Sequence, residues 1–129
     1  MKLSLDEIRQ KYGLNLILLH GSRAVQQMRS DSDTDIAIVR QNRHTALNLL
    51  QLYADLSSAM QNDHLDIVDL THANPLLLKT VTNKAKVLAG SPRHFTELQL
   101  KALHEYNDFL PYFKLEQELN QQELAKLHS

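Results

Sequence analysis

Hydrophobic positions along the chain change their spacing several times, from short continuous aliphatic runs to repeats of three or four residues. Continuous runs bounded by turn residues are typical of mostly buried strands, whereas a period near 3.6 residues predicts helices. The predicted strands cover residues 14–20, 35–39, 65–70 and 87–89. The predicted helices cover about residues 5–12, 23–28, 45–60 and 75–83, and a long one begins at Phe95. Strands that alternate with helices over a short chain predict an α/β or α+β fold with one small sheet.

Two of these helices have residues with specific capping roles at their ends. Ser4 and Glu7 form a capping box, in which each side chain satisfies a free amide at the helix start, and Gly13 suits the left-handed stop. Asn74 is a good N-cap, and Pro75 suits the first helical position after it. These residues therefore fix where the first helix and helix 75–83 begin.

The C-terminal segment has its own apolar pattern, with a spacing of three or four residues from Phe95 to Phe113. Pro111 has no amide hydrogen to donate, so we expect a kink near Asn107. The residues from about Gln117 are polar and should either fray or dock on a partner. A packing stripe, with partner docking as the alternative, is expected for four aromatic residues: Tyr106, Phe109, Tyr112 and Phe113.

Composition limits the classes of protein to which the chain can belong. The 129 residues carry 14 Lys and Arg against 15 Asp and Glu, and 43% of them are hydrophobic, which indicates one globular domain over residues 1–129. Within it we expect a core over about 14–90 and a helical extension over about 91–129. The absence of cysteine excludes disulfides and thiol chemistry. A formal charge of −1 argues against a broad basic face for duplex DNA or anionic lipid, although one phosphorylated ligand could still be bound. No signal peptide or membrane-length apolar run is present, so the cytoplasm is the expected compartment.

Candidate chemistry begins with acidic residues at two predicted strands. Asp33 and Asp35 stand two apart at the start of a strand, so their side chains share one face of the sheet. Two carboxylates at that separation repel by roughly 3 kcal/mol at an effective dielectric near 20, which favours a cation between them. Asp66 begins a later strand between Leu65 and Ile67, where an unpaired carboxylate would be costly to bury. Oxygen ligands without His or Cys favour Mg²⁺ or Mn²⁺.

Gly21 and Ser22 lie between a predicted strand and a predicted helix, and ten residues separate Ser22 from Asp33. Glycine lets the backbone approach a ligand closely, serine offers a hydroxyl, and the amides of a helix start attract anions. A phosphate chain bound there would lie beside carboxylates that can hold its metal ions. The arrangement therefore indicates phosphoryl or nucleotidyl transfer with two metal ions.

With these motifs the segment from about residue 14 to 90 resembles the minimal nucleotidyltransferases (MNT) of the DNA polymerase β superfamily. Within that superfamily it most resembles the MntA-like MNT antitoxins that are encoded beside HEPN-domain toxins. The resemblance implies a small mixed sheet of about four strands flanked by helices. It further implies ATP as substrate with Mg²⁺, transfer of AMP to a hydroxyl, and a HEPN ribonuclease toxin as partner, silenced by AMPylation of a tyrosine and by complex formation.

Site residues carried over by position follow from the same resemblance. Asp33 and Asp35 would bind both metal ions, Asp66 would complete the site and help to deprotonate the incoming hydroxyl, and Gly21-Ser22 would bind the triphosphate. The chain departs from the family pattern at Gln26, near which a second glycine is often found, and at Ser30, where proline is common.

Several residues near these motifs have a simpler interpretation. Asp69 lies at odd spacing from Asp66, so we expect it on the opposite face, bonded to the following turn. His20 is interpreted as a satisfied half-buried histidine and His64 as a residue at a strand entrance, although either could influence the site. Arg23 and Arg29 flank the predicted phosphate-binding segment and could steady its charge, but arginine residues more often lie at the surface without such a role.

Two other functions fit the same sequence. One is transfer of a nucleotide to a small molecule such as an aminoglycoside, although such enzymes usually have a further substrate-binding domain. The other is a binding module without catalysis, which would neutralise a toxin by occlusion alone. Incubation with labelled ATP, Mg²⁺ and the protein encoded by the neighbouring gene distinguishes these functions, because label on a toxin tyrosine supports the enzyme and tight binding without label supports occlusion.

Overall fold

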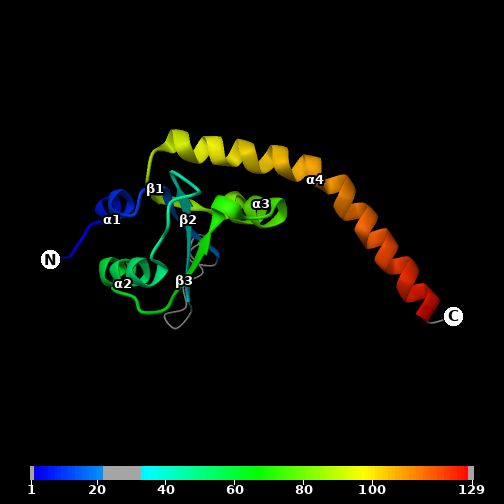
Figure 1. Cartoon of the computed structure of the whole chain (residues 1–129), viewed down its shortest axis with the longest axis horizontal. Helices are drawn as coiled ribbons and strands as arrows, with labels where there is room; N and C mark the ends of the chain where they lie inside the picture. The colour runs from blue at the N-terminus through cyan, green and yellow to red at the C-terminus, as the bar shows by residue number, and fades with distance from the viewer. Residues whose placement is uncertain (1, 22–32, 128–129) are drawn as a thin grey trace.

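A four-stranded sheet with helices packed on both faces forms the body of the protein (Figure 1). The computed structural model describes residues 2–21 and 33–127. Its strands are β1 (Leu14–His20), β2 (Thr34–Arg40), β3 (Leu65–Asp69) and β4 (Lys86–Ala89). Its helices are α1 (Leu5–Lys11), α2 (Leu49–Met60), the short 3₁₀ helix η2 (Leu70–His72), α3 (Pro75–Lys84) and α4 (Pro92–Leu127).

The sheet is mixed, as the family resemblance implies. Its strand order is β3-β2-β1-β4. β1 runs antiparallel to β2 and to β4, whereas β2 and β3 are parallel and α2 connects them. Because β1 and β2 are antiparallel and β2 and β3 are parallel, the C-terminal end of β1 and the N-terminal ends of β2 and β3 lie at the same end of the sheet.

Two hydrophobic clusters hold the helices against the sheet. On one face, Ile8 of α1 and Leu52 and Leu56 of α2 pack against residues such as Ile36 and Ile38 of β2. On the other face, α3 and α4 cover β1 and β2 with four side chains: Leu78, Val81, Leu98 and Ala102. Along β2, Ile36 and Ile38 thus face one cluster and Ala37 faces the other, as the period of two requires.

The predicted strands and helix caps are confirmed, but one helix begins later than expected. Ser4 and Glu7 form the capping box, and Gly13 adopts a φ of 63°. α2 begins at Leu49 instead of residue 45, because the Asn48 side chain accepts the amide of Gln51 and caps the helix there. The predicted helix over 23–28 lies outside the described residues.

α4 is the longest element, with 36 residues, and only its first part is packed on the body. Leu98 and Ala102 are buried against the second cluster, and the remainder extends away from the sheet (Figure 1). Pro111 lies inside this helix, and the ribbon bends in the orange part of its length. The helix is continuous to Leu127. None of the described helices is both long enough and apolar enough to cross a membrane.

Candidate active site

The end of β1 and the start of β2 bring Gly21 and Asp35 into direct contact. His20, the last residue of β1, pairs with Asp35 across the antiparallel ladder. Gly21 follows with a φ of 74°, and a Cβ atom added to it would lie 2.2 Å from Oδ2 of Asp35. The carboxylate therefore occupies the space that any other residue at position 21 would fill. Glycine is needed here for its backbone conformation and for this close approach.

Asp35 and Asp66 lie opposite each other on the parallel strands β2 and β3. Neighbouring strands are about 4.8 Å apart, so the two residues start from adjacent backbone positions. They also share a face, because Ala37 and Val68, two residues further along their strands, belong to the same cluster under α3 and α4. The register thus joins two of the three predicted acidic residues.

Asp33 lies two residues before Asp35, just outside β2, and its side chain is exposed. Asp66 is exposed as well, whereas Asp35 is half-buried. The expectation that apolar neighbours enclose Asp66 is therefore wrong: it is the second residue of the edge strand β3 and is exposed, so it incurs no burial cost. Because two of the three carboxylates are exposed, a ligand could reach them from solvent.

Hydrogen bonds join the start of β2 to the residues just before β3. Asn62 donates from Nδ2 to Oγ1 of Thr34 at 2.7 Å, and the amide of Thr34 donates to the carbonyl of His64 at 2.8 Å. The amide of His64 in turn donates to Oδ1 of Asn62 at 2.8 Å. These bonds hold Thr34, which lies between Asp33 and Asp35, against His64, two residues before Asp66. Sequence patterns gave no signal for them, because Asn62 and Thr34 are 28 residues apart and meet only in the folded chain.

The donor set fits a hard divalent cation by its chemistry, since it consists of carboxylate oxygens. Among residues 2–21 and 33–127, however, no group of three or more His, Asp or Glu side chains lies close enough together to hold a metal ion. Asp35 and Asp66 are paired through the register of β2 and β3, and Asp33 lies two residues before Asp35. Ser22, predicted to bind the triphosphate, and Arg23 and Arg29, which flank it in the sequence, fall outside the described part of the chain.

The neighbouring polar residues only partly match their predictions. His20 is half-buried, as predicted, but its Nε2 is buried and has no hydrogen-bond partner within the described structure, so this nitrogen is not satisfied as expected. His64 stands at the entrance of β3, as predicted. Asp69 accepts the amide of Thr71 at 2.9 Å, which confirms its bond to the following turn.

Comparisons with known proteins agree with this fold. A model of the polymerase beta nucleotidyltransferase family matches residues 4–94. Among solved structures, the chain is similar to a toxin-antitoxin complex with AMP-PNP, at 25% identity and a TM-score of 0.68, over 92% of this chain and 93% of that one. It is also similar to the tri-AMPylated Shewanella oneidensis HEPN toxin in complex with MNT antitoxin, at 26% identity and a TM-score of 0.59, over 88% of this chain and 84% of that one. The MntA-HepT toxin-antitoxin structure shares the fold, at 24% identity and a TM-score of 0.61, over 92% of this chain and 91% of that one.

No curated protein matches the chain significantly. The similarities to toxin-antitoxin structures confirm the resemblance to MNT antitoxins that the sequence motifs indicated. Because the family model spans well over half of the chain and includes Gly21, Asp33, Asp35 and Asp66, the protein belongs to the polymerase beta nucleotidyltransferase family.

Proposed function

We propose that this protein is a Mg²⁺-dependent nucleotidyltransferase that transfers AMP from ATP to a tyrosine of a cognate HEPN toxin, and that it acts as the antitoxin. The observation that carries the proposal is the contact of Gly21 with Asp35, which is paired in register with Asp66. This places two carboxylates beside a backbone position where only glycine fits. ATP is abundant in the cytoplasm, where we propose that the reaction takes place.

In this proposal each site residue has a separate role. Asp33, Asp35 and Asp66 hold the divalent cations, and Gly21 with Ser22 holds the triphosphate. The tyrosine oxygen attacks the α-phosphorus and forms a new P–O bond, while the bond to the bridging oxygen breaks and pyrophosphate leaves. Asp66 accepts the proton of the hydroxyl group. When bound, Mg²⁺ supplies charge stabilisation to the phosphoryl oxygens and lowers the pKa of the attacking hydroxyl.

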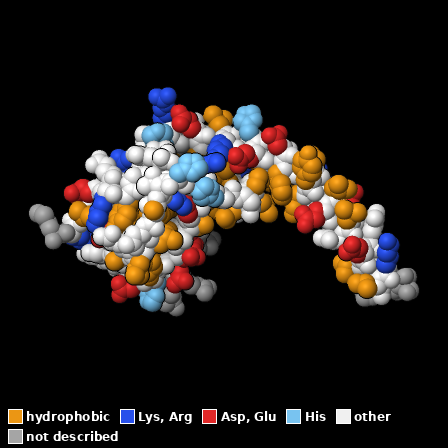
Figure 2. All heavy atoms as spheres, in the orientation of Figure 1, with side chains coloured by type: hydrophobic (Ala, Val, Ile, Leu, Met, Phe, Trp, Pro, Cys, Tyr) orange, Lys and Arg blue, Asp and Glu red, His pale blue; other side chains and the backbone are white. Residues whose placement is uncertain are grey.

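The projecting part of α4 supports a protein partner for this chain. It carries exposed apolar side chains that include Tyr112, Leu115, Leu119 and Leu124, each more than half exposed. Figure 2 shows hydrophobic side chains along this part of the molecule. A similar solved structure holds an AMPylated HEPN toxin together with an MNT antitoxin. We therefore propose that a HEPN toxin covers this helix.

Labelled ATP tests the proposal with the protein encoded by the neighbouring gene as acceptor. Label from the α-phosphate should appear on a toxin tyrosine in the presence of Mg²⁺, whereas label from the γ-phosphate should not, because pyrophosphate leaves. Asp35→Asn should abolish transfer. Transfer of the γ-label would mean phosphoryl transfer and would contradict AMPylation.

A second function, toxin neutralisation by occlusion without catalysis, is favoured by one observation: the described acidic residues do not form a three-membered metal cluster. It predicts a tight complex with the toxin and no label on either protein. The same experiment therefore separates the two functions, and label on an added aminoglycoside would indicate a small-molecule transferase instead.

A further inference from the structure

A basic hollow lies at the opposite end of β2 from the acidic residues. It has a volume of about 520 Å³ and is lined by the loop after β2, by Thr71 of η2 and by Lys101 of α4. Arg40, which ends β2, is five residues from Asp35, so the two sites are about 16 Å apart at 3.3 Å per residue. The hollow is therefore separate from the candidate active site.

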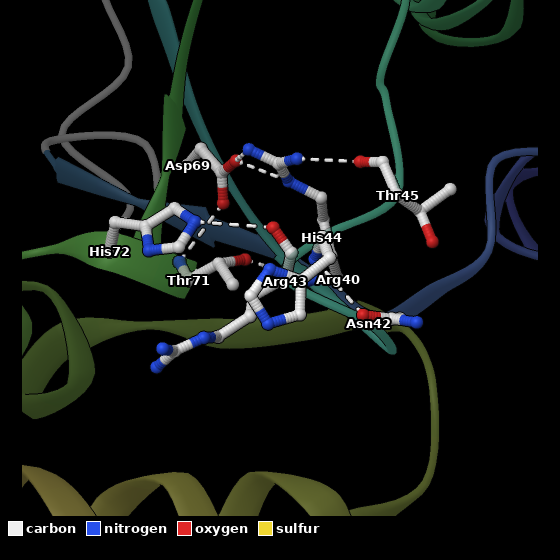
Figure 3. Close-up of polar contacts among 8 residues, drawn as sticks. All are labelled: Arg40, Asn42, Arg43, His44, Thr45, Asp69, Thr71 and His72. Atoms are coloured by element: carbon white, nitrogen blue, oxygen red, sulfur yellow. Dashed lines mark hydrogen bonds and ion pairs between the residues drawn. The ribbon is translucent and has the colours of Figure 1, made fainter.

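A polar network holds the loop that forms one wall of the hollow (Figure 3). Arg40 donates from Nε to Asp69 at 2.7 Å and from Nη1 to the carbonyl of Thr45 at 2.8 Å. Its backbone amide donates to Oγ1 of Thr71 at 3.0 Å, and His72 lies 3.4 Å from the carbonyl of Arg43. Arg40 is thus a structural residue whose charge is offset by Asp69.

The charge that remains available comes from Arg43 and Lys101. Figure 3 shows the guanidinium of Arg43 pointing away from the Arg40–Asp69 pair, and no hydrogen bond or ion pair joins it to another described residue. Lys101 has only a loose contact with Glu105, at 3.9 Å between exposed side chains, which stabilises little. None of the described residues that line the hollow is acidic. An excess of positive charge in a concave site is typical of anion binding.

The lining residues and the volume of the hollow also limit the size and type of ligand that it can hold. Val39, Leu70 and Leu98 contribute apolar surface, while Asn42 and Thr71 contribute polar groups. A volume of about 520 Å³ falls within the range of small-molecule sites, and it exceeds what a single phosphate needs. A guanidinium fork and an ammonium group match the oxygens of a phosphate, and the apolar surface suits a ring or sugar.

We propose that this hollow, named here the Arg43 hollow, is a second ligand site that binds a nucleotide phosphate, with Arg43 and Lys101 on the phosphate and the apolar wall on the nucleoside. The phosphate could belong to a free mononucleotide or to the 5′ end of an RNA strand. This inference does not depend on AMP transfer, because it involves none of the acidic residues.

The test is a titration of the full-length, isotope-labelled protein with AMP in the presence of EDTA, followed by amide chemical shifts. The amides of residues 41–44 should shift in a saturable way. Arg43→Ala and Lys101→Ala should each weaken binding at least tenfold, and Arg43→Lys should recover part of the loss. Arg93→Ala is the matched control, because Arg93 lies on the same helix as Lys101 but does not line the hollow, and its side chain is 87% exposed. This variant should bind AMP like the wild type.

Further titrations distinguish a free mononucleotide from an RNA 5′ end as the source of the phosphate. Tighter binding of a 5′-phosphorylated RNA tetranucleotide, with the same loss in both variants, would support the site and assign it to RNA ends. The proposal is overturned if no probe shifts residues 41–44, if both alanine variants bind normally, or if a poly-glutamate peptide binds there and AMP does not. In Asp35→Asn the AMP-induced shifts of residues 41–44 should have the same midpoint as in the wild type, because Asp35 does not line the hollow. Loss of binding in that variant would place AMP in the acidic site and would also overturn the proposal.

Discussion

Substitution of Gly21 by alanine separates the role of Asp35 from the stability of the fold. The new methyl group would stand 2.2 Å from Oδ2 of Asp35, whereas real contacts of this kind essentially never fall below 3.0 Å. The carboxylate must therefore move by about 0.8 Å or rotate away from β1. Misplacement of a reacting group by about 1 Å can reduce a rate about 100-fold, so we expect a loss of that order in AMP transfer.

The same substitution has a second cost, which comes from the backbone. An alanine at a φ of 74° is less stable than glycine by about 1–2 kcal/mol. A domain of this size typically unfolds with about 5–15 kcal/mol, so the Gly21→Ala variant should remain folded. The melting temperature should fall by about 3–8 °C.

Gly13→Ala is the matched control for this experiment. Gly13 has a φ of 63°, close to that of Gly21, but an added Cβ would meet no atom within 4 Å. It should lower the melting temperature by a similar amount and leave AMP transfer unchanged. Both variants are assayed by transfer of α-labelled AMP and by thermal unfolding. A Gly21→Ala variant that transfers AMP at the wild-type rate would refute the argument that Asp35 must lie against β1 for catalysis.

Three further variants test other parts of the structure. Burial raises the pKa of Asp69, but hydrogen bonds from the following turn and Arg40 outweigh it, so the pKa lies below its ordinary value of 3.8. The stability that the Asp69 carboxylate contributes is therefore present above pH 3.8 and is lost as the pH falls through the lower folded pKa. In urea unfolding at pH 7, Asp69→Asn should be less stable than the wild type by about 1–2 kcal/mol. A difference in unfolding free energy that persists at pH 2 would contradict this. Asn48→Ala removes the α2 cap and should cost about 1 kcal/mol in the same measurement, whereas unchanged stability would mean that the cap is not needed. Leu115→Glu combined with Leu119→Glu should abolish co-purification of the toxin without lowering the melting temperature, because both side chains are about half exposed; retained co-purification would exclude this part of α4 as the docking surface.

Local patterns were sufficient to predict most of the fold. Continuous aliphatic runs marked β1, β2 and β3, and Ser4 with Glu7 marked the start of α1. The start of α2 was predicted too early because Leu47 fits the helical period and packs on the core, although the helix begins only after Asn48. Hydrophobic spacing reports which residues face the core, and the cap decides where the helix begins.

The candidate site was predictable only in part, because tertiary contacts complete it. The spacing of Asp33 and Asp35 is local, but the register that brings Asp66 beside Asp35 depends on the pairing of β2 with β3. The exposure of Asp66 follows from the edge position of β3, which its apolar neighbours do not reveal. The buried Nε2 of His20 likewise depends on the folded surroundings.

A crystal structure with Mn²⁺ and a non-hydrolysable ATP analogue would test most directly whether Asp33, Asp35 and Asp66 hold divalent cations for nucleotidyl transfer. We expect anomalous density within coordination distance, roughly 2.0–2.3 Å, of all three carboxylates, with the triphosphate against Gly21. Manganese bound elsewhere, or an Asp66 carboxylate that points away from the metal ions and the nucleotide, would contradict the proposed catalytic site.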